Sequence, residues 1–190
     1  MSAVDKDLIR QLVEGSISRD NARQLIRMAR KDHERFFNYL EVLQARVHWR
    51  ERILLRIADH LYIVAKPGGG RVVKCDCGRE FGDYRHNWKL AALINVRRTH
   101  EEFAEVYHPA PACPEPDWQE IREYYCPQCS AQLAVEVVPP GYPIVMEMLP
   151  DLDRYYREFL GRPLPDEAAD WYRDDTSLTT RQWRDAASAA

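Results

Sequence analysis

The sequence lacks any apolar run long enough to cross a membrane or to act as a secretory signal. A membrane helix needs roughly 20 consecutive apolar residues, and a signal sequence needs roughly 7–15 of them near the N-terminus. The stretch MSAVDKDLIRQLVEG instead reaches an acidic side chain at Asp5. We therefore predict no membrane association and a cytoplasmic location.

The chain also lacks a strong net charge and a basic segment. Its formal net charge is −3 and its pI is about 6.1. Residues 111–190 carry 7 basic and 15 acidic side chains. A protein that binds nucleic acid needs clustered Lys and Arg to neutralise phosphates. Nucleic acid is therefore not an expected partner.

Familiar catalytic motifs are missing as well. The glycine run PGGGR at residues 67–71 has neither the lysine nor the hydroxyl residue of a phosphate-binding loop, so it predicts a hairpin turn. The histidines are dispersed, and no nucleophile stands beside a base. We expect no catalytic residue in this chain.

Cysteines are few, but four of the five form two close pairs. Five cysteines in 190 residues are too few and too unevenly spaced for a disulfide framework. In a reducing compartment, clustered cysteines more often bind metal. Structural zinc takes four tetrahedral ligands and favours thiolates. We predict one structural zinc ion bound by the cysteines of CDCG and CPQC, which are Cys75, Cys77, Cys126 and Cys129.

Three alternatives stay open for these cysteines. The first is a set of buried free thiols, and the second is a redox dithiol in CPQC. In the third, His86 replaces Cys75 as a zinc ligand, because the C-x-C pair has one residue fewer than the commonest zinc knuckle. The remaining cysteine, Cys113, stands among prolines and is expected not to bind.

Hydrophobic spacing predicts three helices in the N-terminal third of the chain. Gly15 is placed to end the first helix, and Ser18 is placed to cap the second. The residues at helical spacing are Leu8, Ile9, Leu12 and Val13 in the first helix, and Ala22, Leu25, Ile26 and Ala29 on one face of the second. In the third helix, Phe36, Phe37, Leu40, Leu43 and Val47 are predicted to lie inward.

From Ile53 onward, β-branched runs replace the helical pattern. Strands joined by turns are predicted for ILLRI, LYIVAK and RVVKC. The later segment EYYCPQCSAQLAVEVV places the second cysteine pair at a tight turn between two further predicted strands. Two hairpins are thus expected to face one ion. Between them, KLAALINVRR fits a strand or a helix, and YHPAPACPEP is predicted to be a loop because of its four prolines.

The C-terminal part combines a predicted helix with an unusual tail. DLDRYYREFLG predicts a closing helix behind Asp151 and Asp153. The polar segment beyond it carries Trp171, Tyr172 and Trp183. We expect either a partly ordered tail with exposed rings or an arm that lies on a partner.

Together these patterns predict an α+β chain with three parts. Residues 1–59 form an N-terminal helical region. Residues 60–150 form a zinc-centred antiparallel β region that resembles a split zinc ribbon with an insertion. Residues 151–190 form a C-terminal helix and an extended, partner-binding arm.

Four separated segments resemble the gamma subunit of acetone carboxylase. They are DHERFFNYLEVLQARVHW, CDCGREFGDYRHNWKL, WQEIREYYCPQC and PDLDRYYREFLG. Their order and spacing are similar to the family's over most of residues 5–165. Two features depart from the pattern: Gly82 stands before Asp83, where the family often has another cysteine, and the tail after about Asp166 lies outside the resemblance.

The resemblance implies a small, non-catalytic zinc subunit of an ATP-dependent ligase that forms a C–C bond. Its implied partners are large hydantoinase-like alpha and beta subunits, in a hetero-hexamer with two copies of each chain. Those subunits are expected to bind ATP, Mn²⁺ and substrate, and to convert acetone and bicarbonate to acetoacetate with release of AMP and phosphate. The related small subunit of acetophenone carboxylase leaves another ketone open.

Two rival hypotheses about the function predict different behaviour of the purified chain. An independent zinc-ribbon module would be a stable monomer that binds protein or nucleic acid, with a salt-sensitive ligand in the second case. A free-standing thiol or zinc enzyme would be active without other subunits.

Overall fold

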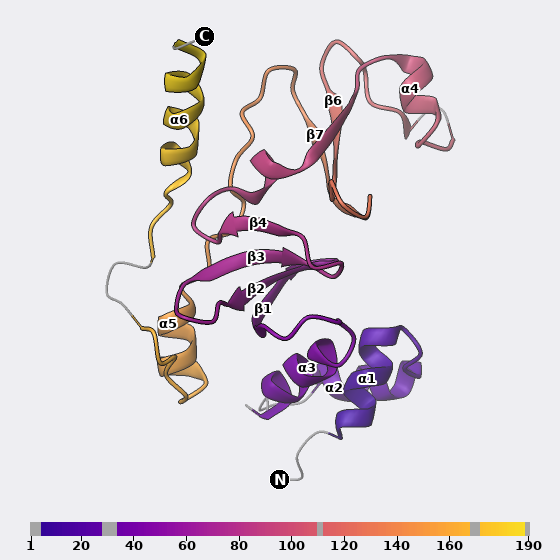
Figure 1. The fold of residues 1–190 in the computed structure, drawn as a ribbon. Coiled ribbons are helices and arrows are strands. Elements are labelled where there is room, and N and C mark those ends of the chain that lie inside the picture. The colour runs from indigo at the N-terminus through magenta and orange to yellow at the C-terminus, as the bar shows by residue number, and fades with distance from the viewer. Residues whose placement is uncertain (1–4, 28–33, 110–111, 168–171, 189–190) are drawn as a thin grey trace.

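The computed structural model describes residues 5–27, 34–109, 112–167 and 172–188. Three helices lie at one end of the molecule, a four-stranded sheet follows them, and a three-stranded sheet lies at the other end (Figure 1). Both sheets are antiparallel. This arrangement of helices and antiparallel sheets confirms the predicted α+β class.

The N-terminal helices are α1 (Lys6–Glu14), α2 (Arg19–Arg27) and α3 (Glu34–Gln44). Gly15 ends α1 with φ +72°, a left-handed conformation that glycine adopts without strain. The Ser18 hydroxyl accepts a hydrogen bond of 3.2 Å from the Asn21 N–H at the start of α2. Both predicted helix boundaries are therefore confirmed.

One side chain of α2 is oriented differently from the prediction. Leu25 is buried in a small core with Ile9 and Val42, whereas Ile26 is 75% exposed. Successive helix positions are about 100° apart, so Ile26 can point to solvent although its neighbour Leu25 is buried. The expectation that Ile26 shares the packed face of Leu25 is wrong, and Ala29 lies outside the described residues.

The four-stranded sheet has the order β1-β2-β3-β4. A turn over residues 67–70 joins β2 to β3, and there the Lys66 N–H donates to the Gly70 carbonyl at 2.9 Å. This confirms the hairpin predicted for PGGG. The strands are β1 (Arg52–Ala58), β2 (Leu61–Ala65), β3 (Arg71–Cys75) and β4 (Glu80–Asp83).

The three-stranded sheet has the order β5-β6-β7 and includes the segment that periodicity left ambiguous. Within KLAALINVRR, the 3-10 turn η1 (Trp88–Ala91) precedes strand β5 (Leu93–Arg97). Helix α4 (His100–Ala104) follows, and the described part of the proline-rich stretch connects α4 to β6. The other two strands are β6 (Glu120–Tyr125) and β7 (Gln132–Val138).

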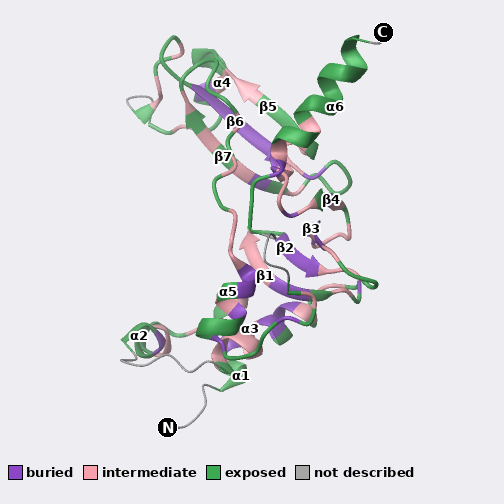
Figure 2. Ribbon diagram, turned by 90° about the vertical axis from the view of Figure 1, so that its left-hand side faces the viewer, coloured by how far each residue is buried: buried purple, intermediate pink, exposed green. Residues whose placement is uncertain are grey.

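One hydrophobic core joins the two sheets to the C-terminal segment. Its buried members come from β1 to β4, from the β6–β7 hairpin and from residues 152–164. Tyr156 crosses this core and donates its hydroxyl hydrogen to the Leu54 carbonyl at 2.8 Å. Figure 2 shows the buried residues concentrated in the sheets and in the elements packed on them.

The predicted closing helix is present as two short turns. These are α5 (Leu152–Arg154) and the π-helical turn η3 (Tyr155–Phe159). Asp151 caps α5, because its carboxylate accepts the Arg154 N–H at 3.1 Å. Arg71 of β3 forms a two-point ion pair with Asp153, which fixes this segment to the sheet.

The tail contains a helix that the sequence patterns did not predict, α6 (Thr176–Ser188). It has no buried residue, and Tyr172 and Trp183 are exposed; Trp171 lies outside the described residues. Its start is held by the Asn87 N–H, which donates to the Thr176 hydroxyl at 2.9 Å. No helix in the described ranges combines the length and apolar character that a membrane crossing requires.

Candidate metal centre

Each cysteine pair lies in a tight turn at the end of a hairpin. In the β3–β4 turn, the Gly78 N–H donates to the Cys75 carbonyl at 2.8 Å, and Gly78 has φ +92°. In the β6–β7 turn, the Ser130 N–H donates to the Cys126 carbonyl at 2.9 Å. Other backbone N–H groups of the two turns, such as those of Cys77 and Cys129, donate to the sulfur atoms.

The two turns bring all four predicted ligands together. Their Sγ atoms lie within 4.8 Å of one another. The Sγ atoms of Cys75 and Cys129 are 3.8 Å apart, and those of Cys77 and Cys126 are 3.7 Å apart. A Zn–S bond of about 2.3 Å places the corners of a regular tetrahedron about 3.8 Å apart. The two Sγ–Sγ distances match that spacing, and all four thiols are close enough to hold one metal ion.

The same distances distinguish the cluster from a disulfide. An S–S bond is about 2.05 Å long, and these cysteines are free. The close pairs each join one turn to the other, so the four thiols connect the two sheets and not two positions of one hairpin.

The surroundings of the thiols disfavour free thiolates in the first turn and favour one at Cys126 in the second. Cys75 and Cys126 are fully buried. Burial raises the pKa of the Cys75 and Cys77 thiols. Burial also acts on Cys126, but the backbone N–H groups of Cys129 and Gln128 bring its pKa below the ordinary value. A divalent cation would compensate the charge of the buried thiolates.

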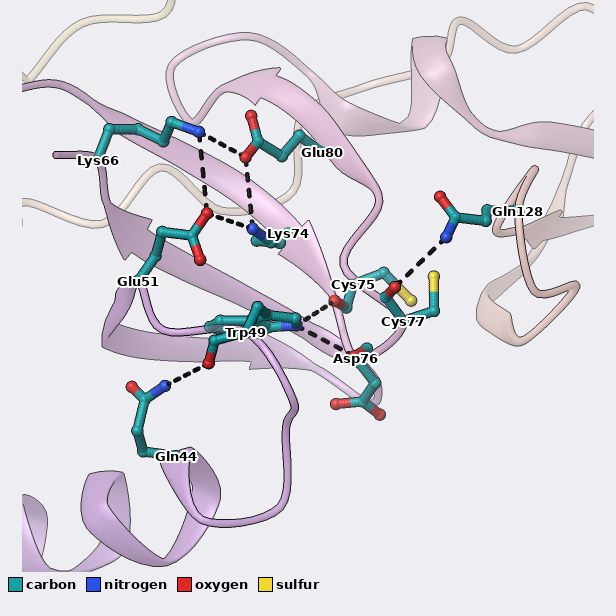
Figure 3. Close-up of polar contacts among 10 residues, drawn as sticks. All are labelled: Gln44, Trp49, Glu51, Lys66, Lys74, Cys75, Asp76, Cys77, Glu80 and Gln128. Carbon is teal, nitrogen blue, oxygen red and sulfur yellow. Dashed lines mark hydrogen bonds and ion pairs between the residues drawn. The ribbon is translucent and has the colours of Figure 1, made fainter.

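The ion pairs beside β3 do not supply that compensation. Lys74 donates to Glu51 at 2.5 Å and to Glu80 at 3.4 Å, and Lys66 donates to Glu80 at 2.6 Å (Figure 3). These bonds lower the pKa of both carboxyl groups. Two lysines thus balance two glutamates, and the network contributes no net positive charge to the neighbouring cysteines.

Two residues that hold the cysteine turns were missed by the sequence patterns. The Trp49 indole N–H donates to the carbonyls of Cys75 and Asp76, and the Gln128 side-chain amide donates to the Cys77 carbonyl at 3.4 Å (Figure 3). Trp49 is 26 residues from Cys75, and no local pattern connects them. The sequence indicated a role for Gln128 only through its position between the two cysteines of CPQC.

The structure places the alternative ligand His86 outside the cluster, and the remaining cysteine, Cys113, lies outside it as well. His86 Nδ1 lies 3.1 Å from the Thr179 hydroxyl of α6. Cys75, which His86 was considered to replace as a ligand, is itself a member of the cluster. Cys113 Sγ lies 4.0 Å from the Tyr107 carbonyl. Within the described residues, the group that could hold a metal ion consists of the two cysteine pairs alone.

Replacing His86 with alanine is therefore expected to leave metal binding unchanged and to loosen α6. The substitution removes the contact with Thr179 but none of the clustered thiols. Zinc per chain, measured on the purified protein, should equal that of the wild type, while limited proteolysis within α6 should become faster. A proportional loss of zinc in His86→Ala would contradict this assignment.

The family model for the acetone carboxylase gamma subunit matches residues 47–160, a range that includes both cysteine turns. The chain belongs to the acetone carboxylase gamma subunit family. This confirms the resemblance found in the four sequence segments. Both sheets and the α5–η3 segment up to Leu160 lie in the matched range, whereas α1, α2, α3 and α6 lie outside it.

Two curated relatives agree with membership of this family. The acetone carboxylase gamma subunit of Xanthobacter autotrophicus is 40% identical over 167 residues, which cover 87% of this chain and 98% of that protein. The acetophenone carboxylase beta subunit of Aromatoleum aromaticum is 35% identical over 79 residues, which cover 41% of this chain and 61% of that protein. Both relatives are named as subunits of carboxylases.

Proposed function

We propose that this chain is the zinc-binding structural subunit of an ATP-dependent ketone carboxylase. Cys75, Cys77, Cys126 and Cys129 would hold Zn²⁺. The observation that carries the proposal is the convergence of four Sγ atoms within 4.8 Å in a member of a carboxylase subunit family. Two of the distances, 3.8 and 3.7 Å, match the spacing of a zinc tetrahedron.

The proposed role of the zinc is to cross-link the two sheets. Four thiolates fill a tetrahedron and leave no position for water or substrate, so the site is structural and not catalytic. Each turn supplies two ligands, and the turns belong to different sheets. The bound ion would therefore fix the orientation of one sheet relative to the other, and with it the shape presented to partner subunits.

Catalysis is assigned to the other subunits of the complex. The names of the two relatives support a ketone as substrate, either acetone or acetophenone. We expect large hydantoinase-like alpha and beta subunits to carry ATP and Mn²⁺, and to convert acetone and bicarbonate to acetoacetate. We further expect a cytoplasmic hetero-hexamer with two copies of each chain and no nucleic acid.

Purification of the native complex from its source tests this function directly. We expect two larger chains to co-elute with this one, about one zinc per copy of this chain, and ketone carboxylation that requires ATP and bicarbonate. The isolated chain should be inactive. Recovery of a stable monomer without zinc, or ketone carboxylation by this chain alone, would overturn the proposal.

A further inference from the structure

Trp49 connects the N-terminal helices to the first cysteine turn. It lies between the end of α3 and the start of β1, and only 9% of its surface is exposed. Its indole N–H points at the turn and donates to the Cys75 carbonyl at 3.2 Å and to the Asp76 carbonyl at 3.1 Å (Figure 3).

These two carbonyls belong to the peptide groups that separate Cys75 from Cys77. The orientation of those peptide planes determines the directions in which the two Cα–Cβ bonds point, and therefore where the thiolates lie. The turn is tighter than the commonest knuckle because it has one intervening residue. A donor that binds both carbonyls at once holds this turn in the conformation that metal binding needs.

The indole is itself held in place from several sides. The Gln44 side chain donates to the Trp49 carbonyl at 3.4 Å and accepts the Ile53 N–H at 3.0 Å, which ties the segment to α3. The Tyr62 ring packs edge-on at 5.9 Å, and the Lys74 ammonium lies 5.0 Å from the indole centroid. The donor is thus fixed before any ion binds.

Gly78 lies against the same edge of the indole, next to the N–H that donates to the turn. A β-carbon at this position would lie 3.5 Å from Trp49 Cδ1, which is ordinary contact distance. The positive φ of Gly78, and not a lack of space, therefore explains the need for glycine. The turn consequently lies directly on a rigid ring.

We infer that Trp49 is a positioning residue of the metal centre, whose indole N–H presets the Cys75–Cys77 turn for zinc. The inference rests on the proposed zinc site. It also links zinc affinity to the packing of α3, because Gln44 at the end of α3 holds the segment that carries Trp49.

The test compares Trp49→Phe with Trp118→Phe in the full-length protein. Trp49→Phe retains a ring but removes the donor, and Trp118 is 78% exposed, so the control makes the same chemical change away from the site. Zn²⁺ affinity is measured by competition with a chelating indicator. We expect Trp49→Phe to bind about 10–100-fold more weakly, the usual effect of losing a group that orients metal ligands. Trp118→Phe should match the wild type.

A second readout separates positioning from general damage to the fold. A merely structural loss lowers thermal stability equally with and without zinc, whereas a positioning loss reduces the increase in Tm that zinc produces. The absorption spectrum of the Co²⁺-loaded protein should also change in Trp49→Phe, because it reports ligand geometry. Equal zinc affinity, equal zinc-dependent Tm increase and an unchanged Co²⁺ spectrum would overturn the inference.

The wild-type protein supplies a measurement that needs no substitution at Trp49. In ¹⁵N-indole spectra, the five tryptophans give separate signals that can be assigned by replacing the other four. Hydrogen exchange of the Trp49 indole should be slow with zinc and without it, because the donor is held before the ion binds. Fast exchange in the zinc-free protein would count against the inference. If the wild type binds no zinc at all, the proposed function fails instead, so the two failures are distinguishable.

Discussion

The Cys126→Ser variant is expected to lose stoichiometric zinc and the fixed relation between the two sheets. Serine offers a neutral, hard oxygen in place of a buried thiolate, so three ligands remain around an ion that favours four soft ones. Structural zinc contributes apparent binding free energies of about 10–16 kcal/mol, which exceeds the whole stability of many domains. Metal analysis and hydrogen exchange of β6 and β7 measure the two effects.

Cys113→Ser is the matched control for that experiment. It makes the same chemical change at the cysteine that lies outside the cluster, beside the Tyr107 carbonyl. We expect unchanged zinc content and only a small change in stability. Full zinc occupancy in Cys126→Ser with wild-type affinity would show that the four thiols do not form the site.

Replacing Arg71 with methionine is expected to destabilise the protein by about 3–5 kcal/mol. Arg71 is 1% exposed and forms ion pairs with Asp153 at 2.5 Å and with Asp166 at 3.1 Å. Methionine has a similar length, but it leaves the buried Asp153 carboxylate without its cation, and removal of one partner of a buried pair costs about this much. Urea unfolding of the two proteins measures the difference.

Arg154→Met provides the exposed counterpart of this substitution. Arg154 pairs with Glu158 one helical turn away, and 62% of its side chain is accessible to solvent. Exposed pairs of this kind contribute about 0.3–0.5 kcal/mol. Hydrogen exchange should also increase over residues 150–166 in Arg71→Met only. Similar small effects from both substitutions would show that the Arg71 ion pairs do not hold the C-terminal segment.

Local patterns predicted those parts of the fold whose cause is local. Gly15 and Ser18 define helix boundaries through contacts with residues a few positions away, and the glycine run before β3 forms its turn within itself. The segment KLAALINVRR could not be assigned in this way. It becomes a strand because Leu93–Arg97 pairs with β6, nearly 30 residues further along the chain.

The buried ion pairs also could not be predicted from local sequence patterns. The sequence around Arg71, Asp153 and Asp166 gave no sign that the arginine would be enclosed with these aspartates, which are 82 and 95 residues away. The tail helix α6 was missed because its inner contacts are few and polar, such as Thr176 with Asn87, so it has no apolar stripe.

The sequence alone determined the cysteine pairs, the alternation of helical and strand segments, and the family, because spacing within short stretches encodes each of them. Only the tertiary structure decided that the pairs meet, since Cys75 and Cys129 are 54 positions apart and their sulfur atoms approach only when two separate sheets pack together. It likewise selected Trp49 as the donor to the first turn. Contacts of this kind depend on how hairpins are arranged in space, which local periodicity does not record.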